Sequence, residues 1–123
     1  MNIKNVLLKK KLIEIKEMMP RTNMHIDFHR ENFMPESING KRFDCIIELS
    51  LSIKDRENKD QNLVEIIVSF VIVVELEKKE KYSKRLSDSI YISIETLYQK
   101  TINDLLKEAN YPPIPITIQV NAP

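Results

Sequence analysis

Apolar residues recur at every second position in three stretches of the chain, residues 24–30, 43–54 and 63–77. Such alternation is the period of a β-strand that turns one face toward a core. Asn39-Gly40 is a turn signal before the second stretch, and the polar run DRENKDQN separates the second stretch from the third. Two long alternating segments joined by a polar connection predict an antiparallel hairpin.

A helical period replaces the alternation after the charged run KKEKYSKR and predicts a helix over about residues 88–109. Asn110 stands where a C-cap belongs, and Pro112 and Pro113 prevent the helix from continuing. The N-cap candidates are Ser87, Asp88 and Ser89. The predicted apolar stripe consists of Ile90, Ile94, Leu97, Thr101 and Leu105, with Tyr91, Tyr98 and Ile102 beside it.

The first segment, residues 3–19, fits two patterns, and Pro20 ends either one. The run LIEI has the β-branched content of a strand, whereas the apolar residues of the segment also recur at helical spacing. The helical spacing is carried by Leu8, Leu12, Ile15 and Met19. From the pattern alone, a strand and a helix both remain open here.

Strands followed by one helix and a short tail, ITIQV, predict a single α+β domain over residues 1–123, with the helix packed on one face of an antiparallel sheet. The other sheet face is also partly apolar, and one helix cannot cover both faces. The apolar residues of that second face are Ile46, Ile67, Val71 and Val73. We expect this face to meet another polypeptide or a second subunit, unless residues 3–19 form a helix that covers it.

Composition excludes several classes of protein. Gly40 is the only glycine, whereas the loops that cradle phosphate groups need several. The 19 basic and 18 acidic side chains leave a net charge of +1, which gives no field for steering toward nucleic acid or an anionic membrane. Lysines interrupt the N-terminal apolar stretch, and the longest apolar run is too short to span a bilayer. We therefore expect a cytoplasmic protein with neither a nucleic-acid nor a membrane partner.

His25, Asp27 and His29 share the polar face of their strand, with alternate side chains about 6–7 Å apart. Two imidazoles and a carboxylate can bind a transition metal, but the polar face of an amphipathic strand is the simpler interpretation. Cys45 lies on the apolar face of its strand and is expected to be a buried, unreactive thiol. No catalytic set is recognisable, so we expect neither an enzyme nor a cofactor.

Three stretches of the chain resemble the SecB family of export chaperones. The segment IEIKEMMPRTN (13–23), followed by MHIDF (24–28), is similar to the first strand of that family and the start of its second. The segments FDCIIELSLSIKD and NLVEIIVSFVIVVEL resemble its two long central strands. A helix leading into NYPPIPI (110–116) resembles the helix and the proline-rich apolar segment that follow them. Together these stretches cover about residues 12–120.

The resemblance implies a four-stranded antiparallel sheet with one helix on one face. It makes residues 11–19 a strand, with a short helix allowed before it. It also implies subunits that pair through sheet and helix, as a dimer or a dimer of dimers, and non-native polypeptide bound in apolar grooves without ATP. The residues then expected at the polypeptide-binding or oligomer interface are Ile46, Ile67, Val71, Val73, Tyr91, Tyr98, Pro112, Pro113 and Ile114.

The chain departs from the SecB pattern in two places. Only Pro20 to Asn23 is available for a crossover that is usually long, so the topology at that point stays open. We expect no counterpart of the second helix and metal-binding tail, which makes a direct role in export doubtful. Shortened relatives serve toxin–antitoxin pairs or occur in phages. Two hypotheses follow: a chaperone that holds non-native polypeptide, or an adaptor or phage inhibitor with one folded protein target.

Overall fold

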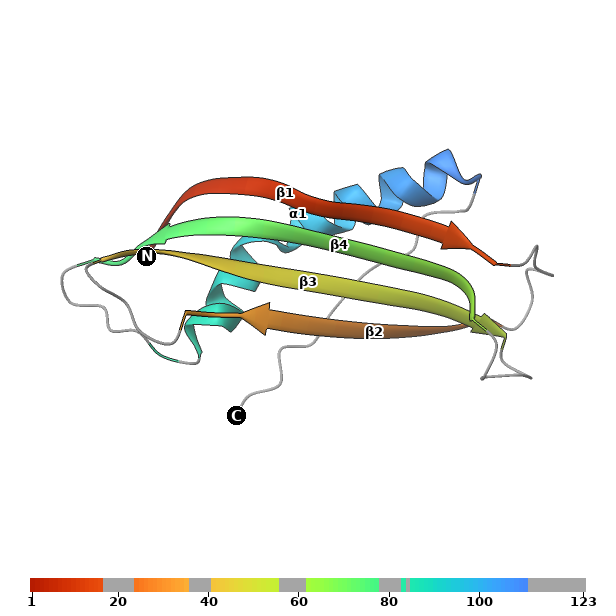
Figure 1. The fold of residues 1–123 in the computed structure, drawn as a ribbon, viewed down its shortest axis with the longest axis horizontal. Coiled ribbons are helices and arrows are strands. Elements are labelled where there is room, and N and C mark those ends of the chain that lie inside the picture. Colours follow the sequence, from red (N-terminus) through yellow and green to blue (C-terminus); the bar gives the residue numbers. More distant parts are fainter. Residues whose placement is uncertain (17–23, 36–40, 56–61, 78–82, 84, 111–123) are drawn as a thin grey trace.

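The computed structural model describes residues 1–16, 24–35, 41–55, 62–77, 83 and 85–110. Four strands form one antiparallel sheet, and a single helix crosses behind it (Figure 1). The elements are β1 (Asn2–Ile15), β2 (Met24–Phe33), β3 (Arg42–Asp55), β4 (Asn62–Glu75) and α1 (Leu86–Glu108). This arrangement is the α+β fold that the sequence predicts.

The strand order across the sheet is β1-β4-β3-β2. The predicted hairpin is confirmed, since β3 and β4 pair along their whole length at the centre of the sheet. β1 and β2 are consecutive in sequence yet lie at opposite edges, separated by three strand spacings, or about 14 Å. The run Pro20 to Asn23, where the sequence leaves the topology open, lies outside the described residues.

The core lies between α1 and one face of the sheet. β3 turns its odd-numbered side chains toward α1 and β4 its even-numbered ones, and all of these between Phe43 and Ile53 and between Val64 and Val74 are buried. Alternate apolar residues on two paired strands make this continuous layer. The buried residues of α1 are Leu86, Ser87, Ile90, Tyr91, Ile94, Tyr98, Ile102, Leu105 and Leu106.

Polar and aromatic contacts fix α1 on the sheet. The Tyr98 hydroxyl donates a hydrogen bond to the backbone carbonyl of Ile47, and the Tyr98 ring packs edge-on against Phe70 with centroids 4.9 Å apart. These two contacts connect the middle of α1 to the centre of the sheet.

A second set of contacts lies at the start of the helix. Asp88 forms an ion pair with Arg30 of β2. The Arg30 guanidinium also lies 4.9 Å from the centroid of the Tyr91 ring, a cation–π contact. The first turns of α1 are therefore tied to the β2 edge of the sheet.

The helical interpretation of the N-terminal segment is wrong. β1 begins at Asn2, so neither a helix over residues 3–19 nor a short helix before residue 11 is present within the described part of that segment. Pairing with β4 explains the outcome, because every residue from Lys10 to Ile15 finds a cross-strand partner there.

Two irregularities in β1 account for the misleading pattern. The register against β4 shifts between Ile3 and Asn5 and again between Leu8 and Lys10. Each shift adds a residue that has no partner and reverses the faces of those that follow. The strict alternation of β1 is therefore broken, and its apolar residues acquire an apparent helical spacing.

The helix differs from its prediction at the start and in its buried face. α1 begins at Leu86, so Ser87, Asp88 and Ser89 lie inside the first turn, and Arg85 at the N-cap makes no side-chain capping bond. Leu97 is 36% exposed, because the buried face is centred on Tyr91 and Tyr98. Asn110 follows the helix with a φ of 61°, the left-handed conformation that asparagine tolerates at a helix end.

Candidate polypeptide-binding face

The sheet face opposite α1, here called the open face, carries an apolar row that crosses all four strands. Leu7 of β1 pairs with Val71 of β4, Val71 pairs with Ile46 of β3, and Ile46 pairs with Phe33 of β2. Directly paired side chains on one face are close enough to touch. Leu7 is 51% exposed and Phe33 is 49% exposed, while Ile46 and Val71 between them are half-buried. The apolar row (Leu7, Val71, Ile46 and Phe33) is therefore a continuous surface open to solvent.

Three more apolar side chains extend this surface along β1 and β4. Val73 lies next to Val71 on one side, and Ile67 lies beyond Ser69 on the other, beside Leu12 of β1. The Ser69 hydroxyl is buried and has no hydrogen-bond partner among the described residues. The four sequence-predicted residues Ile46, Ile67, Val71 and Val73 are thus brought together on one face.

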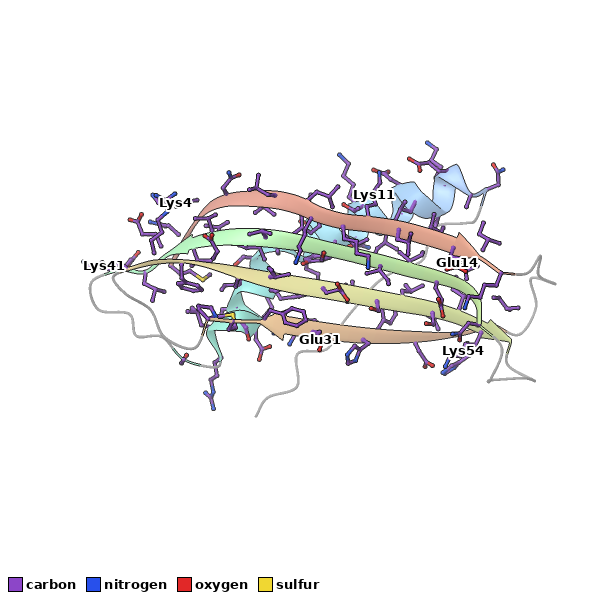
Figure 2. The ribbon with its side chains drawn as sticks, viewed as in Figure 1. Lys4, Lys11, Glu14, Glu31, Lys41 and Lys54 are labelled. Atoms are coloured by element: carbon purple, nitrogen blue, oxygen red, sulfur yellow. The ribbon has the colours of Figure 1, made fainter. Side chains whose placement is uncertain are left out.

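Charged groups surround the apolar surface, and Figure 2 shows several of them. The Lys4 Nζ lies 3.9 Å from a Glu75 carboxylate oxygen at one end of the sheet. Like charges face each other at two places on the open face, where Glu31 is paired with Glu48 and Glu14 with Glu65. Paired like charges destabilise a sheet unless a cation lies between them. Lysines lie on the same face, Lys10 opposite Ser69 and Lys54 beside Asp27, so the apolar centre is surrounded by charges of both signs.

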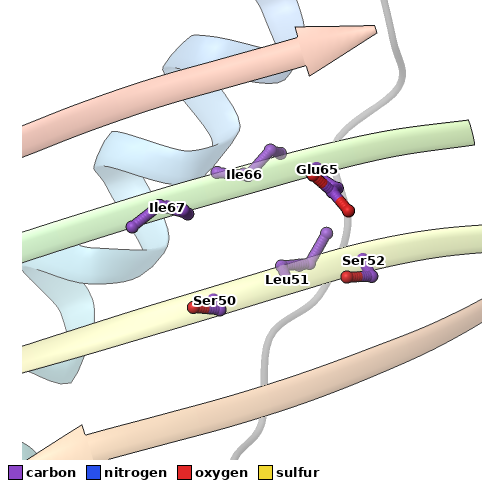
Figure 3. A pocket seen from close by; sticks show the side chains of 6 residues that line it. All are labelled: Ser50, Leu51, Ser52, Glu65, Ile66 and Ile67. Carbon is purple, nitrogen blue, oxygen red and sulfur yellow. The ribbon is translucent and has the colours of Figure 1, made fainter. Parts of the chain in front are cut away.

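A shallow hollow of about 200 Å³ lies between β3 and β4 on the open face (Figure 3). It exists because Ser50 and Ser52 are small, whereas their partners Ile67 and Glu65 are large and form the opposite wall. The hollow therefore presents two hydroxyls, one carboxylate and one aliphatic wall. Its lining residues are Ser50, Leu51, Ser52, Glu65, Ile66 and Ile67.

The carboxylate of the hollow is held in place by two contacts. The Asn62 side-chain amide donates a hydrogen bond of 2.6 Å to Glu65, and the Lys16 Nζ lies 3.4 Å from its other carboxylate oxygen. A side chain that is fixed in this way is ready to accept a further donor without losing much conformational freedom.

The helix tyrosines do not share this face. Tyr91 is 1% exposed and Tyr98 is 0% exposed, and their rings stack at a centroid distance of 5.4 Å in the core between α1 and the sheet. Burial raises the pKa of Tyr91 to about 12 and raises the pKa of Tyr98 as well. The other predicted interface residues, Pro112, Pro113 and Ile114, lie outside the described part of the chain.

His25 and Asp27 form a small polar cluster with Lys54 on the open face. The His25 Nε2 lies 2.7 Å from one Asp27 carboxylate oxygen, and the Lys54 Nζ lies 3.0 Å from the other. The hydrogen bond from Lys54, followed by the smaller contribution of His25, holds the pKa of Asp27 below its usual value. Among the described residues no group of three or more histidine, cysteine, aspartate or glutamate side chains could hold a metal ion. The strand places His29 on the same face, beside Ser50.

Cys45 is buried in the core, as the sequence predicts. Burial, with a smaller contribution from the Asp44 carboxylate, raises the pKa of its thiol to about 11. A buried, protonated thiol is a poor nucleophile.

The β1 edge carries a second set of exposed apolar residues. Leu8 and Ile15 of β1 point to the α1 side of the sheet, yet Leu8 is 51% exposed and Ile15 is 44% exposed. Leu97 on α1 is exposed as well. Within the described structure β1 pairs only with β4, so the backbone groups along its other edge are available to a further strand.

Sequence reasoning missed Leu7, Leu12 and Phe33 as members of the open face. Leu7 and Leu12 were hidden because the bulges of β1 shift its alternation. Phe33 lies three residues beyond the predicted end of its strand, where RENF no longer alternates apolar with polar residues. The register between neighbouring strands, which single-sequence patterns do not supply, is what places all three.

The fold is that of SecB-like chaperones. The structure of a SecB-like chaperone of Mycobacterium tuberculosis, in complex with a ChAD peptide from the HigA1 antitoxin, matches 98% of this chain and 91% of its own chain at a TM-score of 0.74 and 12% identity. A Streptococcus agalactiae protein of unknown function matches 95% of this chain and 96% of its own at a TM-score of 0.46 and 10% identity. No family model and no curated protein matches the sequence. Among the described residues, no helix is long and apolar enough to cross a membrane.

Proposed function

We propose that this chain is a chaperone-like module that holds non-native polypeptide against its open face without nucleotide. The apolar row carries this proposal. Four apolar side chains paired across the whole sheet, two of them about half exposed, are unusual on the outside of a small domain and are typical of a protein-binding surface. The charged groups of both signs around the apolar row limit its contact with other copies of the protein while it is uncovered.

The structural neighbour supports the proposal at the level of the fold. The mycobacterial SecB-like chaperone binds an antitoxin peptide, and its chain matches almost the whole of this one. We propose a partner of the same chemical class, a polypeptide segment bound through apolar side chains. A client in a toxin–antitoxin pair is one candidate of that class.

We further propose that the subunits pair along β1. The exposed residues Leu8, Ile15 and Leu97 support this, because a second copy laid beside β1 would cover them and pair its outer backbone groups. Pairing at this edge leaves the open face free in each subunit. Native mass spectrometry of the wild type and of Leu8→Glu tests it, with a dimer or tetramer expected for the first and a monomer for the second.

Suppression of aggregation tests the proposed function. The wild type is expected to keep a chemically denatured, unrelated protein from aggregating on dilution, and Ile46→Glu is expected to lose that activity. Ile92→Glu is the matched control, because Ile92 is 57% exposed on α1 and does not lie on the open face. Equal loss with both variants, or no suppression by a folded wild type, would contradict the proposal.

The same assay separates the second hypothesis, an adaptor with one folded target. An adaptor is expected to leave unrelated denatured proteins unprotected and to bind one native protein instead. Activity toward several unrelated denatured proteins, lost with Ile46→Glu, excludes it.

A further inference from the structure

We infer that one ordered water molecule binds beneath the first turns of α1, where it bridges Arg30 and Asn32 of β2 to Tyr91 of α1. This site lies on the helix side of the sheet, away from the open face, and it does not depend on the proposed function. Three features point to it, namely the polar atoms buried there, the way the fold brings them together and their hydrogen-bonding capacity.

Three of the four buried side-chain polar atoms that lack a hydrogen-bond partner in the described part of the chain belong to this one place. They are Arg30 Nη1, the Asn32 side-chain oxygen and the Tyr91 hydroxyl. Tyr91 is 1% exposed, so bulk solvent does not reach its hydroxyl. The other guanidinium nitrogen, Nη2, is paired with Asp88, which holds Arg30 in place and leaves Nη1 over. Buried polar groups almost always have a partner, and a charged donor is the most costly one to leave without.

Sheet geometry and helix packing bring the three groups together. Arg30 and Asn32 are alternate residues of β2, so their side chains leave the same face of the sheet about 6–7 Å apart. The guanidinium lies 4.9 Å from the centre of the Tyr91 ring. Asn32 is paired with Ile47, whose carbonyl accepts a hydrogen bond from Tyr98. Because the Tyr98 ring stacks on that of Tyr91, the helix places Tyr91 close to both residues of β2.

The hydrogen-bonding capacity of the three atoms suits a water. Nη1 can only donate, the amide oxygen can only accept and the hydroxyl can do both, yet none of the three is bonded to another. A water between them accepts from Nη1, donates to the amide oxygen and exchanges its third bond with the hydroxyl. Three hydrogen bonds are typical of a buried water. The water thus ties β2 to α1 beside the ion pair between Arg30 and Asp88.

A double-mutant cycle tests the bridge. Tyr91→Phe leaves the water bonded to Arg30 and Asn32, and Asn32→Leu leaves it bonded to Arg30 and Tyr91. Two bonds still hold a buried water, so each single variant is expected to change the folding equilibrium constant little. The double variant leaves only Arg30, so the water is lost and Nη1 is buried without a partner. The constant is then expected to fall about tenfold more than the product of the two single effects, as measured by urea unfolding.

Asn32→Leu combined with Ser69→Ala is the matched control. The Ser69 hydroxyl is also buried without a partner among the described residues, but it lies on the other face of the sheet. The two effects are expected to multiply, because the sites share no group. Effects that simply multiply in the pair Asn32→Leu and Tyr91→Phe as well would overturn the inference.

A crystal structure of the wild type is a second measurement that needs no variant. It is expected to show a single ordered water within about 3 Å of Arg30 Nη1, the Asn32 side-chain oxygen and the Tyr91 hydroxyl. A direct hydrogen bond between Tyr91 and Asn32, or a dry site, would overturn the inference even if the double variant failed to fold.

Discussion

β4 turns six apolar side chains toward α1 and three toward the open face, and the two sets differ mainly in what separates them. On the open face, Ser69 separates Ile67 from Val71 and Val73, and Glu65 and Glu75 flank the set. An unbroken apolar face is covered permanently by the chain's own helix. Under the proposed function, the interrupted face is the one that a partner covers only while it is bound. The helix side of β4 has no polar residue between its apolar ones, and all six are buried: Val64, Ile66, Val68, Phe70, Ile72 and Val74.

The first prediction compares neighbouring residues of β4 and has the largest expected effect. Ile66→Ala empties a site in the core and is expected to lower the free energy of unfolding by about 2–5 kcal/mol. Ile67→Ala removes the same atoms from the open face and is expected to cost about 1 kcal/mol or less. Urea unfolding of both variants measures the difference. Similar losses would mean that the open face is part of the permanent core.

The second prediction compares the two stacked tyrosines. Tyr98→Phe removes the hydroxyl that donates to the Ile47 carbonyl and is expected to cost about 1–3 kcal/mol of stability. Tyr91→Phe removes a buried hydroxyl that has no hydrogen-bond partner in the described part of the chain, and it is expected to be neutral or slightly stabilising. Thermal unfolding of the two variants side by side gives the order. The reverse order would show that the helix is anchored elsewhere.

The third prediction concerns the stability of the protein at alkaline pH, which depends on two groups on the helix side of the sheet. The pKa is raised to about 11 for Cys45 and to about 12 for Tyr91, because the core disfavours their charged forms. Their folded pKa values lie above the unfolded ones, so stability is expected to be unaffected below about pH 9 and to fall as pH rises beyond it. Melting temperatures measured from about pH 7 to about pH 11 check this expectation. A second measurement is the reaction of Cys45 with a disulfide reagent, which is expected only after the protein unfolds. Ready reaction in the folded protein would place Cys45 at the surface.

The smallest expected effect is at the polar end of the open face. Lys54→Met removes the hydrogen bond that holds the pKa of Asp27 down, so that pKa is expected to return toward its usual value. A carboxyl group whose pKa is lowered in the folded protein stabilises the fold at pH values above its usual pKa. That stabilisation is lost as the pH falls through the lowered pKa. Since Asp27 is exposed, the thermal stability near neutral pH is expected to be unchanged. An NMR titration of the Asp27 carboxyl follows the change, and an unaltered pKa would assign the shift to His25 instead.

The sequence predicted the helix side better than the open face. On the helix side of β3 and β4 every second residue is apolar, so the core positions followed from the period alone, and the helix was placed within two residues of its start. The open face depends on which strands are neighbours. Leu7, Ile46 and Phe33 come from distant parts of the chain and form one row only because the strand order is β1-β4-β3-β2.

The two tyrosines on the helix side also depend on contacts between distant parts of the chain, which the sequence pattern does not supply. Their inward position is set by packing, because Tyr98 lies against Phe70 and Tyr91 lies under the Arg30 guanidinium. Neither contact leaves a local pattern in the sequence, since each joins the helix to a strand far away in the chain.

The central claim is that non-native polypeptide binds the open face and not the helix side or the sheet edges. Methyl NMR spectra of the isotope-labelled protein, recorded while an unlabelled, permanently unfolded polypeptide is added, test it most directly. We expect the methyl signals of Ile46, Ile67, Val71 and Val73 to shift in proportion to the added polypeptide while that of Ile92 stays fixed. Shifts confined to Leu8, Ile15 and Leu97, or to the helix, would contradict it.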